Sequence, residues 1–318
     1  MTPHPLYFSV VIPAYNAAHL ISDALKSVFA QTTNDYEIIV VNDGSPDTAE
    51  FEKALEPYLN DITYIRRANG GPAAARNTGI LAAKAEFIAF LDSDDQWEAT
   101  HLEEMREFLQ RDPTLDLVYA DAVNFGESAK KGVTTMDANP SEGLATFESL
   151  VLCKCTVIGS TVVARRQTLI DAGLFDESFI QGEDFELWCR IAYRGGRIDY
   201  RKHIQARRRI HKNNLTSDIV GSFAGQARAL RKFMNELDLP EGLRKDMERE
   251  LEKCDAAIAL EKCKQQLVAR RYREAVVELE RANAAYRSRK LQLVLYLMHT
   301  VPRLVRHMYL RQRDTSTG

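Results

Sequence analysis

The chain has 318 residues, enough for one large domain or for one medium domain with an appendage. Its apolar fraction of 45% and charged fraction of 27% are ordinary for a soluble globular protein, and its net charge of −3 argues against nucleic acid as a partner. No apolar stretch is long enough to span a bilayer, and residues 1–8 lack the basic-then-apolar pattern of a signal peptide. The five cysteines lack ladder-like or zinc-ligand spacing, so we expect reduced thiols in a cytoplasmic protein.

Strand-like and helix-like patterns alternate along the N-terminal part of the chain. Short apolar runs predict strands at residues 8–12, 37–41, 62–65, 87–91 and 117–119. Apolar residues at helical spacing predict helices at 17–31, at 48–59, from about Ala73 and at 98–110. This alternation is typical of βαβ units, so we predict an α/β fold with a mostly parallel sheet and helices on both faces.

Three carboxylates, Asp92, Asp94 and Asp95, follow the apolar run at 87–91. Such an oxygen-rich corner at a strand end suits Mg²⁺ or Mn²⁺, because hard divalent ions bind one or two protein carboxylates together with phosphate oxygens. The alternative is a solvated turn in which Asp95 caps a helix that starts near Trp97.

Polar residues also follow the first two predicted strands, at 13–16 and at 42–45. Ligands of parallel sheets gather beyond the carboxyl ends of the strands. There Tyr15 offers a ring on which a base can stack, and Asp43 offers an acceptor for an imide N–H, although an ordinary turn is the alternative for 42–44. No Walker loop and no Gly-x-Gly-x-x-Gly pattern follows any of these strands, so a metal ion would have to neutralise a nucleotide diphosphate.

Six blocks of sequence, in the expected order, carry a resemblance to a known family. They are residues 10–16, 40–45, 71–79, 90–95, 173–177 and 182–188. Together they resemble the family 2 glycosyltransferases over about residues 6–215. The resemblance implies the Rossmann-like GT-A fold and an inverting reaction that uses a nucleotide sugar. One departure is Asn42, where the family commonly has an aspartate, but the carboxylate that contacts uracil aligns with Asp43, which is retained.

The resemblance also implies roles for individual residues. Asp184 would be the general base for the acceptor hydroxyl, in the first turn of a helix whose N-terminus favours an ionised carboxylate. Asp94 would bind the divalent ion, with Asp95 beside it and His211 reaching the metal or the diphosphate. The residues implied to bind substrate are Pro13, Tyr15 and Asp43 at the nucleoside base, Asp92 at the ribose or the metal, and Arg76, Glu183 and Trp188.

Three of these assignments have structural alternatives. Glu183 and Asp184 could be first-turn charges at a helix start. Trp188, four residues after Asp184 on the same helical face, could be a core tryptophan instead of an acceptor contact. His211 could be a surface histidine in a basic loop.

The composition changes after about residue 217. Residues 218–318 are rich in Ala, Leu, Glu, Lys and Arg at helical spacing, which predicts an α-helical region after a catalytic domain at 1–217. From Arg281 through Arg313 there is no acidic residue, and basic residues flank the apolar run at 291–298. Such a basic amphipathic segment favours peripheral contact with an anionic membrane, while an ordinary helix packed in the appendage is the alternative. A protein partner bound through the helical tail is a further expectation.

The sequence therefore predicts an inverting glycosyltransferase that depends on Mg²⁺ or Mn²⁺. By resemblance its donor is a UDP-sugar, and its acceptor is a hydroxyl of a glycan or lipid-linked molecule in bacterial surface polysaccharide synthesis, at the cytoplasmic face of the inner membrane. One alternative is a nucleotidyltransferase that makes sugar nucleotides, which would carry a glycine-rich basic loop after the first strand. The other is a non-catalytic module that binds nucleotide sugars or acts as a scaffold.

Overall fold

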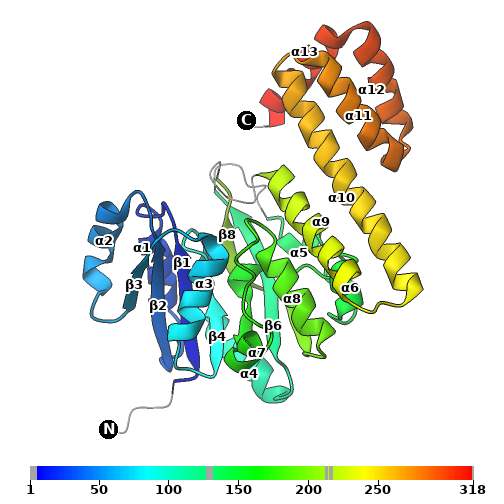
Figure 1. Cartoon of the computed structure of the whole chain (residues 1–318). Coiled ribbons are helices and arrows are strands. Elements are labelled where there is room, and N and C mark those ends of the chain that lie inside the picture. The colour runs from blue at the N-terminus through cyan, green and yellow to red at the C-terminus, as the bar shows by residue number, and fades with distance from the viewer. Residues whose placement is uncertain (1–5, 127–131, 212–213, 215–217, 317–318) are drawn as a thin grey trace, which may run out of the picture. The chain divides into compact units, whose positions relative to one another are not determined.

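The computed structural model describes residues 6–126, 132–211, 214 and 218–316 (Figure 1). The chain forms two compact units, Met1–His211 and Lys212–Gly318. The boundary predicted after residue 217 falls at a residue outside the described part, so it stays a prediction.

The first unit is built on one eight-stranded sheet. Its strands are β1 (Phe8–Ala14), β2 (Tyr36–Asp43), β3 (Thr63–Arg67), β4 (Phe87–Phe90), β5 (Gln96–Trp97), β6 (Leu117–Phe125), β7 (Val163–Arg165) and β8 (Ile198–Arg209). They are ordered β3-β2-β1-β4-β7-β6-β8-β5. β3, β2, β1 and β4 are parallel, as the alternating sequence pattern predicts, whereas β7 is antiparallel to both of its neighbours.

Helices connect these strands and pack on the sheet (Figure 1). They are α1 (Ile21–Phe29), α2 (Thr48–Leu55), α3 (Gly71–Ala82), α4 (His101–Arg111), α5 (Thr135–Ala138), α6 (Phe147–Val151), α7 (Arg166–Asp171) and α8 (Glu183–Tyr193). The predicted helix at 48–59 ends early as an α-helix, because Pro57 lies in a 3₁₀ turn at Glu56–Tyr58.

Small residues let α3 lie close to β1. Ala73, Ala74 and Ala75 are buried, and a Cβ at Gly79 would overlap the side chain of Val11. Since α3 follows β3, it begins on the side of the sheet where the parallel strands end.

The long strand β8 brings the chain back to the acidic segment that follows β4. β8 is parallel to β6 and antiparallel to the two-residue strand β5, where Gln96 pairs with Arg207. Because this pairing is antiparallel, the residues just before Gln96 lie beside those just after Arg207. The end of β8 therefore meets the acidic segment.

The second unit contains five helices in its described part. They are α9 (Ile219–Glu236), α10 (Glu241–Val268), α11 (Tyr272–Tyr286), α12 (Arg289–Thr300) and α13 (Pro302–Ser316). An apolar core that includes Leu267, Leu279 and Met298 joins α10, α11 and α12. Pro302 begins α13, since proline is tolerated in a first helical turn but not in a helix interior. Among the described residues, none of the helices combines the length and apolar character that a membrane crossing requires.

His101, the first residue of α4, is a buried titratable group outside the rim of the sheet. Its ring centroid lies 4.4 Å from that of Trp97, and neither ring nitrogen has a hydrogen-bond partner in the described part of the chain. Burial lowers the pKa of His101 to about 3, because an imidazolium ion there would lose its hydration.

We predict that His101→Phe makes the protein less sensitive to acid. The unfolded chain protonates His101 near pH 6.5, whereas the folded protein keeps it neutral down to about pH 3. Between these values the unfolded state binds more protons, so the free energy of unfolding falls as the pH is lowered, by about 2 kcal/mol from pH 7 to pH 5. Urea unfolding at pH 7 and at pH 5 measures the free energy of unfolding of both proteins. On going to pH 5, the parent protein should lose about 2 kcal/mol more of this free energy than His101→Phe. An equal loss in both proteins would contradict the prediction.

Candidate active site

The carboxyl ends of β1, β2 and β4 meet at one edge of the parallel half of the sheet. β1 lies between the other two strands and pairs with both in parallel. Pro13 is near the end of β1, Asp43 ends β2, and the segment 91–95 follows β4. The structure therefore brings together the three groups of polar residues that the sequence placed at strand ends.

Asp43 is almost fully buried and ties this edge to the loop before α3. Its carboxylate accepts hydrogen bonds from the N–H groups of Gly70 and Gly71, the shortest of them 2.7 Å, and lies 3.2 Å from the guanidinium of Arg67. The carboxylate thus holds the start of α3 in place.

Tyr15 presents an open aromatic surface beside Asp43's strand. Its side chain is 55% exposed, and the next residue, Asn16, has a positive φ of 53°. The N–H of Asn16 donates to the hydroxyl of Ser45 over 2.5 Å, which joins the loop after β1 to the loop after β2. A planar base can reach the ring of Tyr15 from solvent.

Asp95 anchors the acidic segment from within. It is 4% exposed, its Oδ2 accepts a hydrogen bond of 2.6 Å from the hydroxyl of Ser160, and its Oδ1 accepts one of 2.8 Å from the N–H of Arg209. Burial raises the pKa of Asp95 well above its ordinary value, and the neighbouring carboxylate of Asp94 raises it further. α4 begins only at His101, so Asp95 does not cap a helix near Trp97.

Asp94 faces His211 across the junction of the acidic segment and β8. The two side chains lie 3.0 Å apart between Asp94 Oδ2 and His211 Nε2, and each is about three-quarters buried. Burial raises the pKa of Asp94, Asp92 raises it further, and the hydrogen bond with His211 lowers it.

Arg76 bridges two carboxylates that are far apart in the sequence. Its Nη2 lies 2.8 Å from Asp92 after β4, and its Nη1 lies 2.6 Å from Glu183 at the start of α8. Arg76 is 12% exposed and Glu183 8%, so this pair is largely shielded from water. Burial acts to lower the pKa of Arg76, but the two carboxylates outweigh it and raise the pKa above its ordinary value. Burial raises the pKa of Glu183, and Arg76 acts in the opposite direction.

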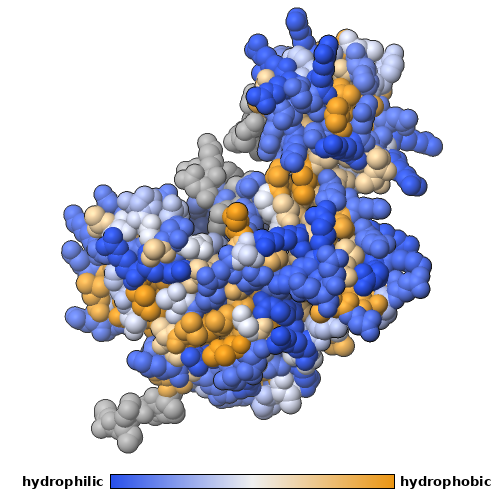
Figure 2. All heavy atoms as spheres, in the orientation of Figure 1, coloured by the Kyte–Doolittle hydropathy of each residue, from blue (hydrophilic) through white to orange (hydrophobic). Residues whose placement is uncertain are grey.

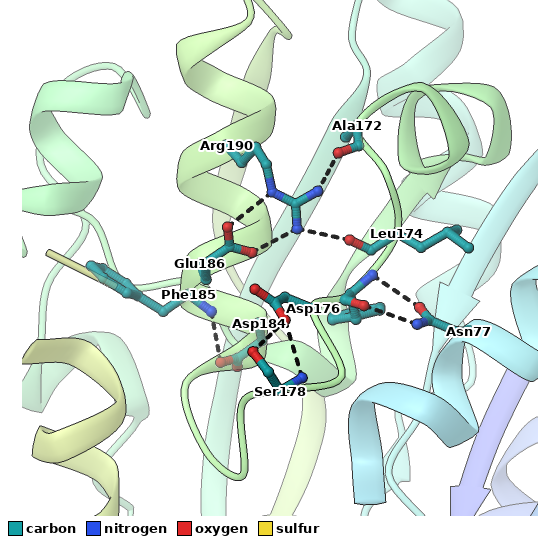
Figure 3. A network of polar contacts seen from close by, with 10 residues as sticks. Asn77, Ala172, Leu174, Asp176, Ser178, Asp184, Phe185, Glu186 and Arg190 are labelled. Carbon is teal, nitrogen blue, oxygen red and sulfur yellow. Dashed lines mark hydrogen bonds and ion pairs between the residues drawn. The ribbon is translucent and has the colours of Figure 1, made fainter. Parts of the chain in front are cut away.

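Asp184 occupies the first turn of α8, next to Glu183. Gly182 precedes the helix with a φ of 80°, a conformation that favours glycine. Asp184 is half-buried, and its Oδ1 accepts the N–H of Phe185 over 2.7 Å (Figure 3). Asp184 thus lies at the N-terminal end of α8.

Arg190 holds α8 against the segment that precedes it, as Figure 3 shows. Its guanidinium donates to both carboxylate oxygens of Glu186 and to the carbonyls of Ala172 and Leu174. Glu186 has no exposed side-chain surface, so its charge is balanced inside the protein.

Asn77, next to Arg76 in α3, fixes the same segment from the other side (Figure 3). It exchanges two hydrogen bonds of 2.9 Å with the main chain of Phe175 and donates to Glu177 over 3.0 Å. Two connections therefore join α3 to α8. One is the ion pair of Arg76 with Glu183, and the other is the segment at 172–175, which is hydrogen-bonded to Asn77 of α3 and to Arg190 of α8.

Trp188 lies in the core beneath this network. It is 3% exposed and packs against the rings of Phe90 and Phe175, with centroid distances of 6.2 Å and 5.6 Å. Its Nε1 is buried without a hydrogen-bond partner among the described residues. This placement fits the alternative of a core tryptophan, because a side chain so buried offers little surface to an acceptor.

The described residues at this edge offer two adjacent groups that could bind a metal ion. Within the described ranges, no group of three or more His, Cys, Asp or Glu side chains is arranged to hold an ion. Asp94 and His211 are close enough to supply one oxygen and one nitrogen ligand. This pair fits a divalent ion that takes its other ligands from phosphate oxygens and water.

Ser160 and Arg209 also contact the acidic segment, although neither belongs to a sequence motif described above. Ser160 lies in a single 3₁₀ turn with no motif around it. Arg209 donates through its Nε to the carbonyl of Asp94 and through its Nη2 to Asp23. Its position two residues before His211 is a signal that could have assigned it to the site.

The sheet and its helices form a GT-A fold, which confirms the fold expected from the sequence. The chain belongs to glycosyl transferase family 2, whose model matches residues 9–155.

Relatives of known role and of unknown role share this family. The chain is 33% identical over 186 residues to WfgD, the UDP-Glc:alpha-D-GlcNAc-diphosphoundecaprenol beta-1,3-glucosyltransferase of Escherichia coli. The matched region covers 58% of this chain and 68% of WfgD. It is 46% identical over 99 residues to the Rhizobium meliloti succinoglycan biosynthesis protein ExoW, about a third of each chain (30% and 31%). An uncharacterized glycosyltransferase of Rickettsia conorii is 28% identical over 64% of this chain, which spans only 34% of that relative's length.

Solved structures share the fold at lower identity. The S. aureus TarS 1–349 structure in complex with UDP-GlcNAc has a TM-score of 0.62 and 20% identity, over 96% of this chain and 92% of that one. The mannosyltransferase PcManGT from Pyrobaculum calidifontis, in complex with GDP-Man and Mn²⁺, has a TM-score of 0.63 and 19% identity, over 96% and 84% of the two chains.

We predict that Arg76 and Glu183 are energetically coupled. Arg76→Gln should lower the free energy of unfolding by about 3 kcal/mol, because it leaves the buried Glu183 carboxylate without its cation. Glu183→Gln should cost much less when introduced into the Arg76→Gln protein than into the parent. Urea unfolding of the two single variants and the double variant measures the coupling.

Arg111→Gln is the matched control for this cycle. Arg111 pairs with Glu107 at the surface, where its side chain is 65% exposed, so its loss should change the free energy of unfolding by no more than about 0.5 kcal/mol. Additive effects of Arg76→Gln and Glu183→Gln would show that the two residues do not act as a pair.

Proposed function

We propose that this protein is an inverting glycosyltransferase that moves a sugar from a UDP-sugar to a hydroxyl of a glycan or lipid-linked acceptor. The observation that carries the proposal is the Arg76 bridge, which links Asp92 at the strand ends to Glu183 beside Asp184. A donor held at the strand ends would thereby meet a carboxylate suited to activate an acceptor. The name of WfgD, with its UDP-Glc donor and diphosphoundecaprenol-linked acceptor, supports the same substrate classes here.

The donor's nucleoside would bind at the ends of β1 and β2. Tyr15 would stack on the base, Pro13 would pack beside it, and Asp43 would accept the imide N–H of uracil. Asp92 would bind the ribose hydroxyls, because its carboxylate is 37% exposed and already oriented by Arg76.

Asp94 and His211 are the residues that would hold a divalent ion, Mg²⁺ or Mn²⁺. When bound, the ion would act as a Lewis acid that balances charge on the diphosphate leaving group. Asp95 would keep the segment in place through Ser160 and the N–H of Arg209, since both of its oxygens already accept hydrogen bonds.

Asp184 would act as the general base. Its carboxylate would take the proton of the acceptor hydroxyl as that oxygen forms a bond to the anomeric carbon of the sugar. The bond from the anomeric carbon to the diphosphate oxygen breaks on the opposite face, so the configuration inverts and the nucleoside diphosphate leaves.

Surface polysaccharide synthesis at the cytoplasmic face of the membrane is the pathway class that we propose. ExoW, by its printed name a succinoglycan biosynthesis protein, supports it. The basic segment of the helical unit would contact anionic lipid peripherally. Family membership favours this function over a nucleotidyltransferase or a non-catalytic module.

We predict that Asp184→Asn abolishes transfer without weakening donor binding. Removing a general base should lower kcat by about 10²- to 10⁴-fold, while the Kd for the UDP-sugar stays within about twofold. Nucleotide release from a panel of UDP-sugars with candidate acceptors, together with calorimetric titration of UDP, separates the two effects. Full activity in this variant would show that the base lies elsewhere. Asp61→Asn, the same change at an exposed residue before β3, should leave both quantities unchanged.

We also predict that Asp94→Asn removes most of the effect of Mn²⁺ on nucleotide binding. In the parent protein Mn²⁺ should tighten UDP binding, and the variant should lose at least about tenfold of that gain because it lacks a charged oxygen ligand. Calorimetric titration of UDP with Mn²⁺ and with EDTA measures the gain without any need for turnover. The same gain in Asp94→Asn as in Asp61→Asn would rule out Asp94 as a ligand.

A further inference from the structure

Helices α10 to α13 enclose an apolar pocket of about 600 Å³. We call it the helical-unit pocket; its lining includes Leu267, Leu279, Val294 and Met308, together with Lys264 and Lys290. Protein cores have few voids larger than a water molecule, and ligand pockets commonly measure about 300–1,000 Å³. The helical-unit pocket therefore has the size and lining of a site for a hydrocarbon group.

The charged side chains that line this pocket are both lysines. Two of its twelve lining residues are lysines and none is acidic. Lys264 pairs with Glu261 at 2.8 Å, whereas Lys290 makes no ion pair within the part of the chain that the structure describes. The same holds for Arg289 beside it and for Arg303 in α13. An anionic group beside Lys290 would therefore meet a cation that is not neutralised by an ion pair within the described residues.

The two helices α12 and α13, which line one side of the pocket, also carry exposed apolar side chains. Leu293 and Tyr296 of α12 are 60% and 65% exposed, and Leu304 and Met308 of α13 are 53% and 58% exposed. Each pair is spaced three or four residues apart, so its members lie on one face of their helix. Figure 2 shows apolar surface among hydrophilic side chains on this unit. Exposed apolar residues among unpaired cations are typical of segments that lie at a membrane surface.

We propose that the helical-unit pocket binds an anionic phospholipid of the membrane, with an acyl chain in the pocket and the phosphate beside Lys290. This proposal deepens the proposed membrane contact and rests on it. A second copy of the chain suits the pocket less well, because it would bring two copies of residues 281–313, which contain basic but no acidic residues, against each other. A phospholipid supplies both the hydrocarbon and the negative charge that the pocket lacks.

Flotation of the full-length protein with vesicles tests the proposal. Vesicles of phosphatidylcholine with 30% phosphatidylglycerol, at about 0.1 M salt, should bind the protein at least tenfold more tightly than phosphatidylcholine alone. Two variants address the pocket directly. Val294→Phe should fill it and Lys290→Glu should repel the phosphate, and each should lower binding at least tenfold.

Matched controls carry the same changes outside the pocket. Val277→Phe alters an exposed valine of α11, and Lys262→Glu alters an exposed lysine of α10; both should bind within about twofold of the parent protein. Thermal melting should show that Val294→Phe remains folded, since it adds an apolar ring to an apolar cavity.

The outcomes separate the pocket from the membrane contact. If the parent protein floats and Val294→Phe floats equally well, the pocket is not the site, although the membrane contact stands. If the controls lose as much binding as the pocket variants, the attraction is a general effect of charge and the proposal fails. If the parent protein does not float with either vesicle, both ideas fall. Because no donor or acceptor is present, none of these results bears on glycosyl transfer.

Discussion

The candidate site depends on one buried guanidinium. Arg76 pairs with Asp92 and Glu183 at once, and without it the largely buried carboxylate of Glu183 would lack its cation. Its position is set by α3, whose alanines and Gly79 allow close contact with β1. Packing of small residues in the core thus decides where the charged groups of the rim lie.

A second constraint is the short pairing of β5 with β8. Two residues of β5 are enough to align the end of β8 with the acidic segment, so that Asp94 meets His211 and the N–H of Arg209 reaches Asp95. Main-chain pairing at this one place brings an imidazole nitrogen beside the acidic segment, and these are the two groups that we propose as metal ligands.

The sequence predicted the parallel half of the sheet well and the other half poorly. Strands near Phe8, Tyr36, Thr63 and Phe87 have continuous apolar runs, which local periodicity detects. β7 is three residues long and β8 mixes polar with apolar positions, so both depend on pairing with distant strands. The motifs identified the acidic residues as site candidates. No local pattern shows that Asp95 accepts a hydrogen bond from Ser160, or that Trp188 packs against Phe90 and Phe175.

The contact between Asp94 and His211 spans 117 positions of the chain, and that between Asp23 and Arg209 spans 186. Contacts of such long range form late, since the intervening chain must be ordered first. A nascent chain that has emerged from the ribosome only as far as β7 therefore lacks half of the candidate metal pair. On the proposed function, competence to bind the ion would arise in one step, when β8 joins the sheet and places His211 beside Asp94.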